Sequence, residues 1–208
     1  MRIYGMSDSG NCYKPRLLLA MLGQPFEHVE TNSRDGSTRT PEYLAKNPNG
    51  KVPLLELDDG RTIAESNAIL LYLAEGTPFL PADRYDRAIV NQWLFFEQYS
   101  HEPNIAVRRS LKLYPERAAQ ATPERMAALL EAGDRALGVM EAQLSRTPYL
   151  AGDAITVADI ALFAYTQDAA IAGYDMGRYP GVSSWLDRVR AAPGFVSMDT
   201  KPAQFPQR

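Results

Sequence analysis

The dipeptide Asp59-Gly60 is the feature that most limits what this chain can fold into. It separates two strand-like runs, residues 52–57 and residues 61–64. Asp-Gly between two such runs is a strong β-hairpin signal, because the turn needs residues that accept a positive φ. We therefore expect an antiparallel strand pair here, followed by a helix that Ser66 would cap at its N-terminus.

Upstream of the hairpin, the pattern is strand, helix, strand. Residues 2–5 and 26–30 have strand character, and residues 16–22 form an apolar helical run. Pro15 fits only the first turn of that helix, because it has no N–H to donate. This succession predicts a parallel crossover unit. A short helix at residues 41–45 would lie between it and the hairpin.

Residues 77–81, Thr-Pro-Phe-Leu-Pro, interrupt the pattern and read as a domain linker. Beyond it, Thr156 and Asp159 have capping-box spacing at a helix start. The predicted fold is α/β plus all-α, with a thioredoxin-like N-terminal domain over residues 1–78 and a C-terminal helical bundle domain over residues 84–208. The predicted helical stretches are residues 83–113, 123–144, 156–170 and 182–191.

The composition argues against several classes of protein. The 22 basic and 25 acidic residues give a net charge of −3, so no basic field predicts binding to nucleic acid or to a membrane surface. The first residues read as a strand and lack the apolar core of a signal peptide, which favours a cytoplasmic location. One cysteine, Cys12, and two distant histidines, His28 and His101, do not predict a metal site.

Pro53 stands at the start of an apolar strand pattern, where a proline removes a ladder hydrogen bond. A cis Val52-Pro53 bond would turn the N–H and C=O of Val52 out of the sheet, where they could pair with an extended peptide. The alternative is an edge-strand proline without a ligand.

Glu65-Ser66 lies one hairpin downstream, at the start of a predicted helix. The N–H groups and partial positive charge of a helix N-terminus bind a carboxylate well, and Glu65 could accept from an ammonium group. The pair would suit a ligand with an α-amino-acid end. An ordinary N-cap beside a solvated glutamate is the alternative.

Four segments, in this order, resemble the glutathione transferase superfamily, in its bacterial serine/asparagine-type form. The resemblance extends over nearly the whole chain. The segments are Asn-Pro-Asn-Gly-Lys-Val-Pro-Leu-Leu at 47–55, Glu-Ser-Asn-Ala-Ile-Leu-Leu-Tyr-Leu at 65–73, Thr-Val-Ala-Asp-Ile at 156–160, and the run from Tyr-Pro at 179–180 to Pro-Gly-Phe at 193–195.

The resemblance implies that the first domain binds glutathione as co-substrate. Val52 would pair with the cysteinyl backbone, and Glu65 and Ser66 would hold the γ-glutamyl group. Arg39 or Lys51 would neutralise the glycine carboxylate, although both could be solvated surface charges. The implied glutathione-binding residues are Arg39, Lys51, Val52, Pro53, Glu65 and Ser66.

The residue that activates the thiol should lie just after the first strand. Ser9 matches the serine of serine-type classes, and Asn11 matches an asparagine found in a bacterial class related to disulfide-bond reductases. Both are candidate catalytic residues, and Ser9 is also a possible N-cap. Ser7 is a weaker alternative. The spacing places Cys12 in the first helical turn, facing the core, and a shifted alignment would instead make it a redox cysteine.

The resemblance places the second-substrate pocket on the first long helix of the helical domain. Tyr99, His101 and Arg108 lie on that stretch, where each could equally be a packing or surface residue. The implied activity is attack of the glutathione thiolate on a small hydrophobic electrophile, in a cytoplasmic homodimer. A glutathione-dependent disulfide reductase or peroxidase is the first alternative, and a non-catalytic binding module is the second.

Overall fold

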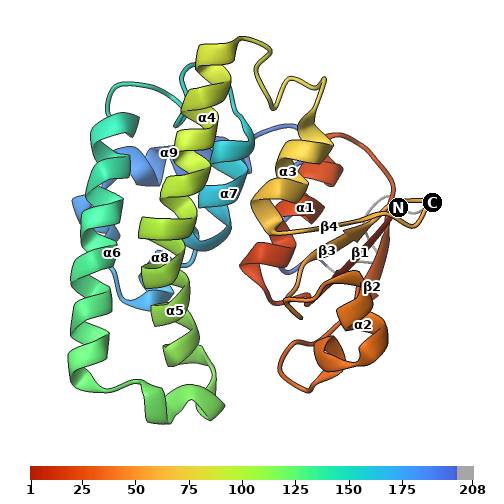
Figure 1. Cartoon of the computed structure of the whole chain (residues 1–208). Helices are drawn as coiled ribbons and strands as arrows, with labels where there is room; N and C mark the ends of the chain where they lie inside the picture. The colour runs from red at the N-terminus through yellow and green to blue at the C-terminus, as the bar shows by residue number, and fades with distance from the viewer. Residues whose placement is uncertain (201–208) are drawn as a thin grey trace. The chain divides into compact units, whose positions relative to one another are not determined.

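A computed structural model of the chain describes residues 1–200 of 208 (Figure 1). The chain forms two compact units. The first contains Met1–Gly76 together with the described residues from Ala192 onward, and the second is Thr77–Ala191. No helix within residues 1–200 is both long and apolar enough to cross a membrane.

The first unit is built on a four-stranded sheet in the order β2-β1-β3-β4. Strand β1 (Arg2–Gly5) runs parallel to β2 (Glu27–Glu30) and antiparallel to β3 (Leu54–Glu56), which pairs with β4 (Thr62–Ala64). The parallel pair follows from the strand-helix-strand pattern, and the antiparallel pair from the Asp-Gly turn. The thioredoxin-like expectation for this part of the chain is confirmed.

Helices α1 (Gly10–Met21) and α3 (Ser66–Ala74) lie side by side in the first unit (Figure 1). The apolar core of this unit includes fully buried side chains from β1, α1, β3 and α3. Helix α2 (Pro41–Lys46) contacts the other face of the sheet. On β1, Tyr4 points away from the buried Ile3 beside it, and its ring packs edge-on against Tyr43 of α2. The core residues include Ile3, Leu17, Leu18, Leu55, Ile69 and Leu70.

Two local predictions for these helices are wrong. Pro15 lies inside α1 and not in its first turn, because the helix begins at Gly10, directly after the N-cap Ser9. Ser66 is the first helical residue of α3, and Glu65 occupies the N-cap position instead. The N-cap at Glu65 is not visible in the sequence, because it depends on the backbone conformation between β4 and α3.

Residues 192–200 return to the first unit, whereas the sequence-based division assigned them to the helical domain. The Tyr13 hydroxyl donates to the carbonyl oxygen of Val196 at 2.5 Å. Gly194 has φ +75°, and a Cβ there would lie 2.8 Å from the Cα of Met21. A glycine is required at this close approach to α1. The predicted extent of the helical domain to residue 208 includes residues 201–208, which lie outside the described part.

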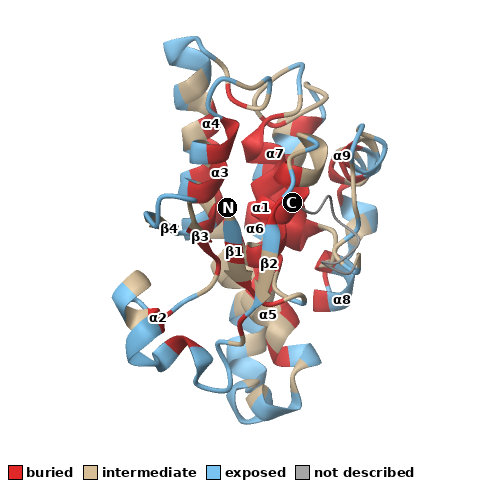
Figure 2. Cartoon of the chain, turned by 90° about the vertical axis from the view of Figure 1, so that its right-hand side faces the viewer, coloured by how far each residue is buried: buried red, intermediate tan, exposed pale blue. Residues whose placement is uncertain are grey.

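The second unit is helical, as the helical-bundle expectation requires. Helix α6, whose limits match residues 123–144, runs along α5 (Figure 1). All ten residues of α7 are buried, which makes it the centre of this unit (Figure 2). The helices are α4 (Arg84–Phe96), α5 (Glu102–Leu113), α6 (Pro123–Leu144), α7 (Val157–Thr166), α8 (Ala169–Ala172) and α9 (Pro180–Arg190).

The first long helix of this unit is not continuous over residues 83–113, as the sequence had suggested. A π-helical turn, Glu97–His101, joins α4 to α5. Pro103 follows directly in the first turn of α5, and a proline cannot donate the helical hydrogen bond that a continuous α-helix would need there. The chain accommodates this loss by widening the turn before the proline.

The predicted capping box at the start of α7 is present. The Thr156 hydroxyl oxygen accepts from the Ala158 N–H at 3.2 Å, and the Asp159 carboxylate accepts from the Thr156 N–H at 2.8 Å. The same carboxylate also accepts from the Leu150 N–H and the Trp185 indole N–H, both at 2.9 Å. Burial raises the pKa of Asp159, and these three donors, together with the Thr156 hydroxyl at 3.2 Å, oppose that shift.

Candidate functional site

The first turn of α1 presents the Ser9 hydroxyl. Ser9 is the N-cap with φ −91° and ψ 126°, and its oxygen accepts from the Cys12 N–H at 3.4 Å. The Ser9 N–H donates to the Met6 carbonyl oxygen at 3.3 Å, which closes the turn between β1 and α1. The cap uses the hydroxyl oxygen as an acceptor, and a hydrogen bond from the Ser9 side chain also opposes the rise in the pKa of Cys12.

Cys12 faces the core, as its spacing predicted. Its side chain is fully buried, and its sulfur accepts from the Met6 N–H at 3.4 Å. A Cβ on Gly5 would lie only 3.0 Å from this sulfur, so the thiol is packed directly against β1. Burial raises the pKa of Cys12 to about 11. A buried, protonated thiol is a poor nucleophile, which weighs against the redox alternative.

The start of α3 has an unusual backbone. Glu65 has φ 68° and ψ 116°, and it is the one residue other than glycine with a positive φ among residues 1–200. Such a conformation is strained for a residue with a Cβ. In the described part of the chain, the Glu65 side chain caps no N–H of the first helical turn and is exposed. The first turn of α3 therefore receives no hydrogen bond from the side chain of its N-cap residue.

Side chains from α1 and α3 meet at this point. The buried Ser66 hydroxyl donates to the Asn11 side-chain oxygen at 3.3 Å. The Lys14 ammonium, which is fully buried, donates to the Ser66 hydroxyl and to the Asn67 side-chain oxygen, each at 3.3 Å. The structure thus joins a predicted catalytic residue, Asn11, to a predicted binding residue, Ser66.

Sequence reasoning missed Lys14. The available signal was a lysine one helical turn after Asn11, in a stretch that is otherwise mostly apolar. Its partner Ser66 is 52 residues away, so only the packing of α1 on α3 reveals the contact. Lys14 places a positive charge behind the start of α3.

The Val52-Pro53 peptide bond is cis, one of the alternatives that the sequence left open. Val52 precedes β3, and within residues 1–200 its N–H and C=O make no hydrogen bond to another group of the chain. The preceding carbonyl, that of Lys51, accepts from the Tyr43 hydroxyl at 2.7 Å and from the Asn47 side-chain amide at 2.9 Å. The loop that carries Val52 is therefore held firmly while Val52 itself stays available.

Arg39 lies against the same loop. Its guanidinium donates to the Asn49 carbonyl oxygen at 3.2 Å, and a Cβ on Gly50 would lie 2.5 Å from its Nη1. With φ +59° as well, position 50 requires glycine. Both Arg39 and Lys51 are exposed at this loop.

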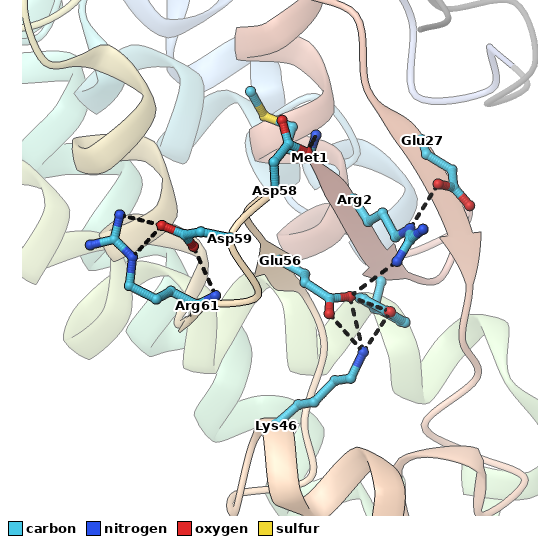
Figure 3. A network of polar contacts seen from close by, with 9 residues as sticks. Met1, Arg2, Glu27, Lys46, Glu56, Asp58, Asp59 and Arg61 are labelled. Atoms are coloured by element: carbon cyan, nitrogen blue, oxygen red, sulfur yellow. Dashed lines mark hydrogen bonds and ion pairs between the residues drawn. The ribbon is translucent and has the colours of Figure 1, made fainter.

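Tyr4 belongs to a separate polar network on the sheet. Its hydroxyl donates to Glu56 at 2.5 Å and accepts from the Lys46 ammonium at 2.8 Å. Figure 3 shows Lys46 pointing at Glu56, with Arg2 between Glu56 and Glu27. The hydrogen bonds from Tyr4 and Lys46 hold the pKa of Glu56 below its usual range. Tyr4 is half-buried, and its hydroxyl is already engaged.

The structure does not bring the three second-substrate candidates together. His101 is fully buried in the second unit, with its Nε2 2.8 Å from the Thr166 hydroxyl oxygen. Arg108 donates to backbone carbonyls of Ala172 and Met126, which tie α5 to α8 and α6. Tyr99 is 87% exposed. His101 and Arg108 are thus structural here, because helix packing engages both side chains. Within residues 1–200, no three His, Cys, Asp or Glu side chains gather as metal ligands would.

Comparison with known proteins agrees with this architecture. Residues 3–79 match the family model described as the glutathione S-transferase N-terminal domain, and residues 123–188 match the glutathione S-transferase C-terminal domain. Glutathione S-transferase F10 of Arabidopsis thaliana is 36% identical over 72% of this chain and 72% of its own. Disulfide-bond oxidoreductase YfcG of Escherichia coli (strain K12) is 29% identical over 88% of this chain and 87% of its own.

Among solved structures, a glutathione S-transferase from Pseudomonas fluorescens superposes with a TM-score of 0.92 at 51% identity, covering 95% of this chain and 98% of that one. The two family models together match more than half of the chain, and they match the two halves in the expected order. The chain belongs to the glutathione S-transferase family.

Proposed function

We propose that the protein is a glutathione transferase that binds glutathione on its first unit and stabilises the thiolate for attack on a small apolar electrophile. The observation that carries this proposal is the 3.3 Å hydrogen bond from Ser66 to Asn11. It links the start of α3, which suits the amino-acid end of glutathione, to the start of α1, which suits its sulfur.

The γ-glutamyl end would lie at the start of α3. Its α-carboxylate would accept from the N–H of Ser66, in the positive field of the helix and of the Lys14 ammonium behind it. The Glu65 carboxylate would accept from the α-ammonium. Binding of both charges would give the strained backbone at Glu65 a function.

The rest of the tripeptide would follow the loop before β3. The N–H and C=O of Val52, next to Pro53, would pair with the cysteinyl backbone as a short antiparallel ladder. Arg39 and Lys51, both exposed at this loop, would neutralise the glycine carboxylate. With the two ends of the tripeptide held in this way, its sulfur would point towards α1.

Ser9 and Asn11 would stabilise the thiolate. A free thiol has a pKa of about 8.5, so little of it is thiolate at neutral pH. Lowering the pKa by about two units takes roughly 2.7 kcal/mol, which a hydroxyl donor together with a helix N-terminus can supply. The sulfur then bonds to the electrophilic atom, and the leaving group departs with its electron pair. This serine/asparagine arrangement defines the class that we propose.

A glutathione-dependent disulfide reductase is the second candidate, favoured by Asn11 and by the likeness to a disulfide-bond oxidoreductase. Here the thiolate would attack one sulfur of a disulfide and release the other as a thiolate. Cys12 takes no part in this chemistry, because it is fully buried. Activity on a small disulfide without activity on an aryl halide would select the reductase.

We further propose that the protein is a cytoplasmic homodimer whose role is detoxification. Exposed aromatic side chains follow one face of α4 and the π turn: Tyr85, Phe95 and Tyr99 are 71%, 76% and 87% exposed. Large apolar groups that recur along one helix face in this way favour a protein interface. A second copy of the chain is the proposed occupant, and sedimentation measurements of wild type and Phe95→Asp would test it.

Replacing Ser9 by alanine tests the thiol chemistry. We expect the pKa of bound glutathione, read from its ultraviolet thiolate absorbance, to rise by about one unit or more, because the hydroxyl donor is lost. Thr122→Ala is the matched control, since Thr122 is also an N-cap whose hydroxyl accepts from its own helix, α6. If Ser9→Ala leaves the pKa unchanged, Ser9 has no role in activation.

A further inference from the structure

Ser7 lies two residues before Ser9, in the turn between β1 and α1. The Glu30 carboxylate, from the end of β2, holds this residue at two points. Its Oε1 accepts from the Ser7 N–H at 3.1 Å, and its Oε2 accepts from the Ser7 hydroxyl at 2.5 Å. A carboxylate that accepts from two groups of one residue fixes both its position and its orientation.

The third polar group of Ser7, its carbonyl oxygen, is held by a side chain of α1. The Arg16 guanidinium, fully buried within α1, donates from Nη2 to the Ser7 carbonyl oxygen at 2.8 Å. The N–H, hydroxyl and carbonyl of Ser7 are thus all engaged by side chains from two other elements. The turn that carries Ser9 is therefore anchored to both β2 and α1.

His28 in turn orients Glu30. Its Nε2 lies 3.0 Å from the same Oε2 that accepts from Ser7, and its side chain is only 5% exposed. Burial lowers the pKa of His28, so the ring is neutral at pH 7. Because Glu30 can only accept, the proton of the neutral ring lies on Nε2. Two side chains of β2 and the Ser7 side chain therefore form one chain of hydrogen bonds, in which His28 and Ser7 both donate to Glu30.

We infer that Glu30 is a positioning residue of the thiol site, which acts through Ser7 to hold the Ser9 hydroxyl in line with the glutathione sulfur. This inference rests on the proposed function. Glu30 touches neither glutathione nor the reacting atoms. It fixes the backbone turn from which Ser9 projects, and a misplacement of a catalytic donor by a fraction of an ångström is costly to reaction rate.

Glu30 is ionised wherever the enzyme would work. Burial alone would raise the pKa of this carboxyl, but the hydrogen bonds from Ser7 and His28 outweigh it and hold the pKa below its usual value. The two hydrogen bonds from Ser7 to Glu30, called here the Glu30 clamp, are therefore complete at neutral pH. They are lost only when acid protonates Glu30.

Strand β2 supplies a matched control. Glu27 lies three residues before Glu30 with nearly the same exposure, 55% against 57%, but it pairs with Arg2 instead of the turn. The experiment compares Glu30→Gln and Glu30→Ala with Glu27→Gln. The readouts are kcat for an aryl halide, the pKa of bound glutathione and the dissociation constant of glutathione.

We expect Glu30→Ala to lower kcat about fivefold to tenfold and to raise the pKa of the bound thiol. The dissociation constant should stay within about twofold, because the tripeptide is held by other elements. Glu30→Gln keeps the shape but removes the charge, so its effect should be intermediate. Glu27→Gln should match wild type in all three readouts. If the charges of β2 had only a structural role, Glu27→Gln and Glu30→Gln would change the readouts equally.

Ser7→Ala tests whether Glu30 acts through Ser7. It should reproduce part of the Glu30→Ala loss, and the two changes together should cost no more than Glu30→Ala alone. If Glu30→Ala fails to fold, the kcat and thiol pKa of Ser7→Ala test the inference in its place. Equal kcat and thiol pKa in wild type, Ser7→Ala and Glu30→Gln would overturn the inference while leaving the proposed function intact. Wild-type protein that binds no glutathione would overturn both.

Discussion

Helices α7 and α3 begin in opposite ways. At the start of α7, Thr156 and Asp159 satisfy the first turn from within the chain, and the Val157 N–H donates to the Phe79 carbonyl oxygen at 3.0 Å. At the start of α3, the N-cap residue is a strained glutamate whose side chain caps nothing among the described residues. A closed helix start, capped from within the chain, stabilises the fold, whereas an open one, without a side-chain cap, can bind a ligand.

The largest effect should come from removing the closed start. Asp159→Ala takes away one carboxylate that accepts from four donors, including the Trp185 indole and the Leu150 N–H. Leaving several buried donors without an acceptor should cost about 3–5 kcal/mol of unfolding free energy. Urea unfolding measures this cost. Asp187→Ala is the control, because Asp187 is 79% exposed, and its change should stay within about 0.5 kcal/mol.

An Asp159→Ala protein as stable as wild type would contradict the closed-start account. Glutathione affinity per folded molecule should be unchanged in this variant, because Asp159 belongs to the second unit and its hydrogen bonds serve the start of α7.

A substitution at the start of α3 should affect glutathione affinity more than stability, the reverse of Asp159→Ala. Ser66→Ala should cost only about 1 kcal/mol of stability, through its hydrogen bonds to Lys14 and Asn11, but should weaken glutathione binding about tenfold or more. Calorimetric titration measures the affinity, and Thr156→Ala, which should lose about 1 kcal/mol of stability with unchanged affinity, is the comparison. Equal affinity losses in the two variants would remove the distinction between the helix starts.

Glu65→Gly separates strain from binding. Glycine adopts φ 68° without a steric cost, so the unfolding free energy should stay within about 1 kcal/mol of wild type or rise. Glutathione binding should nevertheless weaken, because the carboxylate that would accept from the α-ammonium is lost. A Glu65→Gly protein with full affinity would show that the strained backbone has no binding role.

The smallest expected effect concerns the buried thiol of Cys12 in α1. Burial raises the pKa of Cys12 to about 11, above its ordinary value of 9.0. The folded state therefore retains a proton that the unfolded state loses, and stability should fall as pH rises from about 9 to 11. Cys12→Ala should remove this part of the slope in alkaline urea unfolding. An unchanged slope would mean that Cys12 titrates alike in both states.

Much of the fold could be predicted because its signals are local. The Asp59-Gly60 turn predicts the β3–β4 hairpin, and Thr122 followed by Pro123 defines the start of α6. The capping box of α7 was predicted for the same reason, since all of its atoms lie within one helical turn. Only the resemblance, and no local rule, pointed from Glu65-Ser66 to glutathione.

The remaining features depend on contacts between distant residues. The burial of Lys14 against Ser66, the return of residues 192–200 to α1 and the Glu30 clamp on Ser7 each join segments that are far apart in the sequence. The positive φ of Glu65 could not be predicted, because no turn residue marks it. The contact of His101 with Thr166 likewise joins residues on two different helices.

Calorimetric titration of the wild-type protein with glutathione tests the central claim most directly. The proposed site predicts saturable binding with one glutathione per chain at millimolar ligand or below, weakened about tenfold or more by Ser66→Ala and unaffected by Thr156→Ala. Absence of binding at millimolar glutathione would contradict the claim that the open start of α3 is a glutathione site.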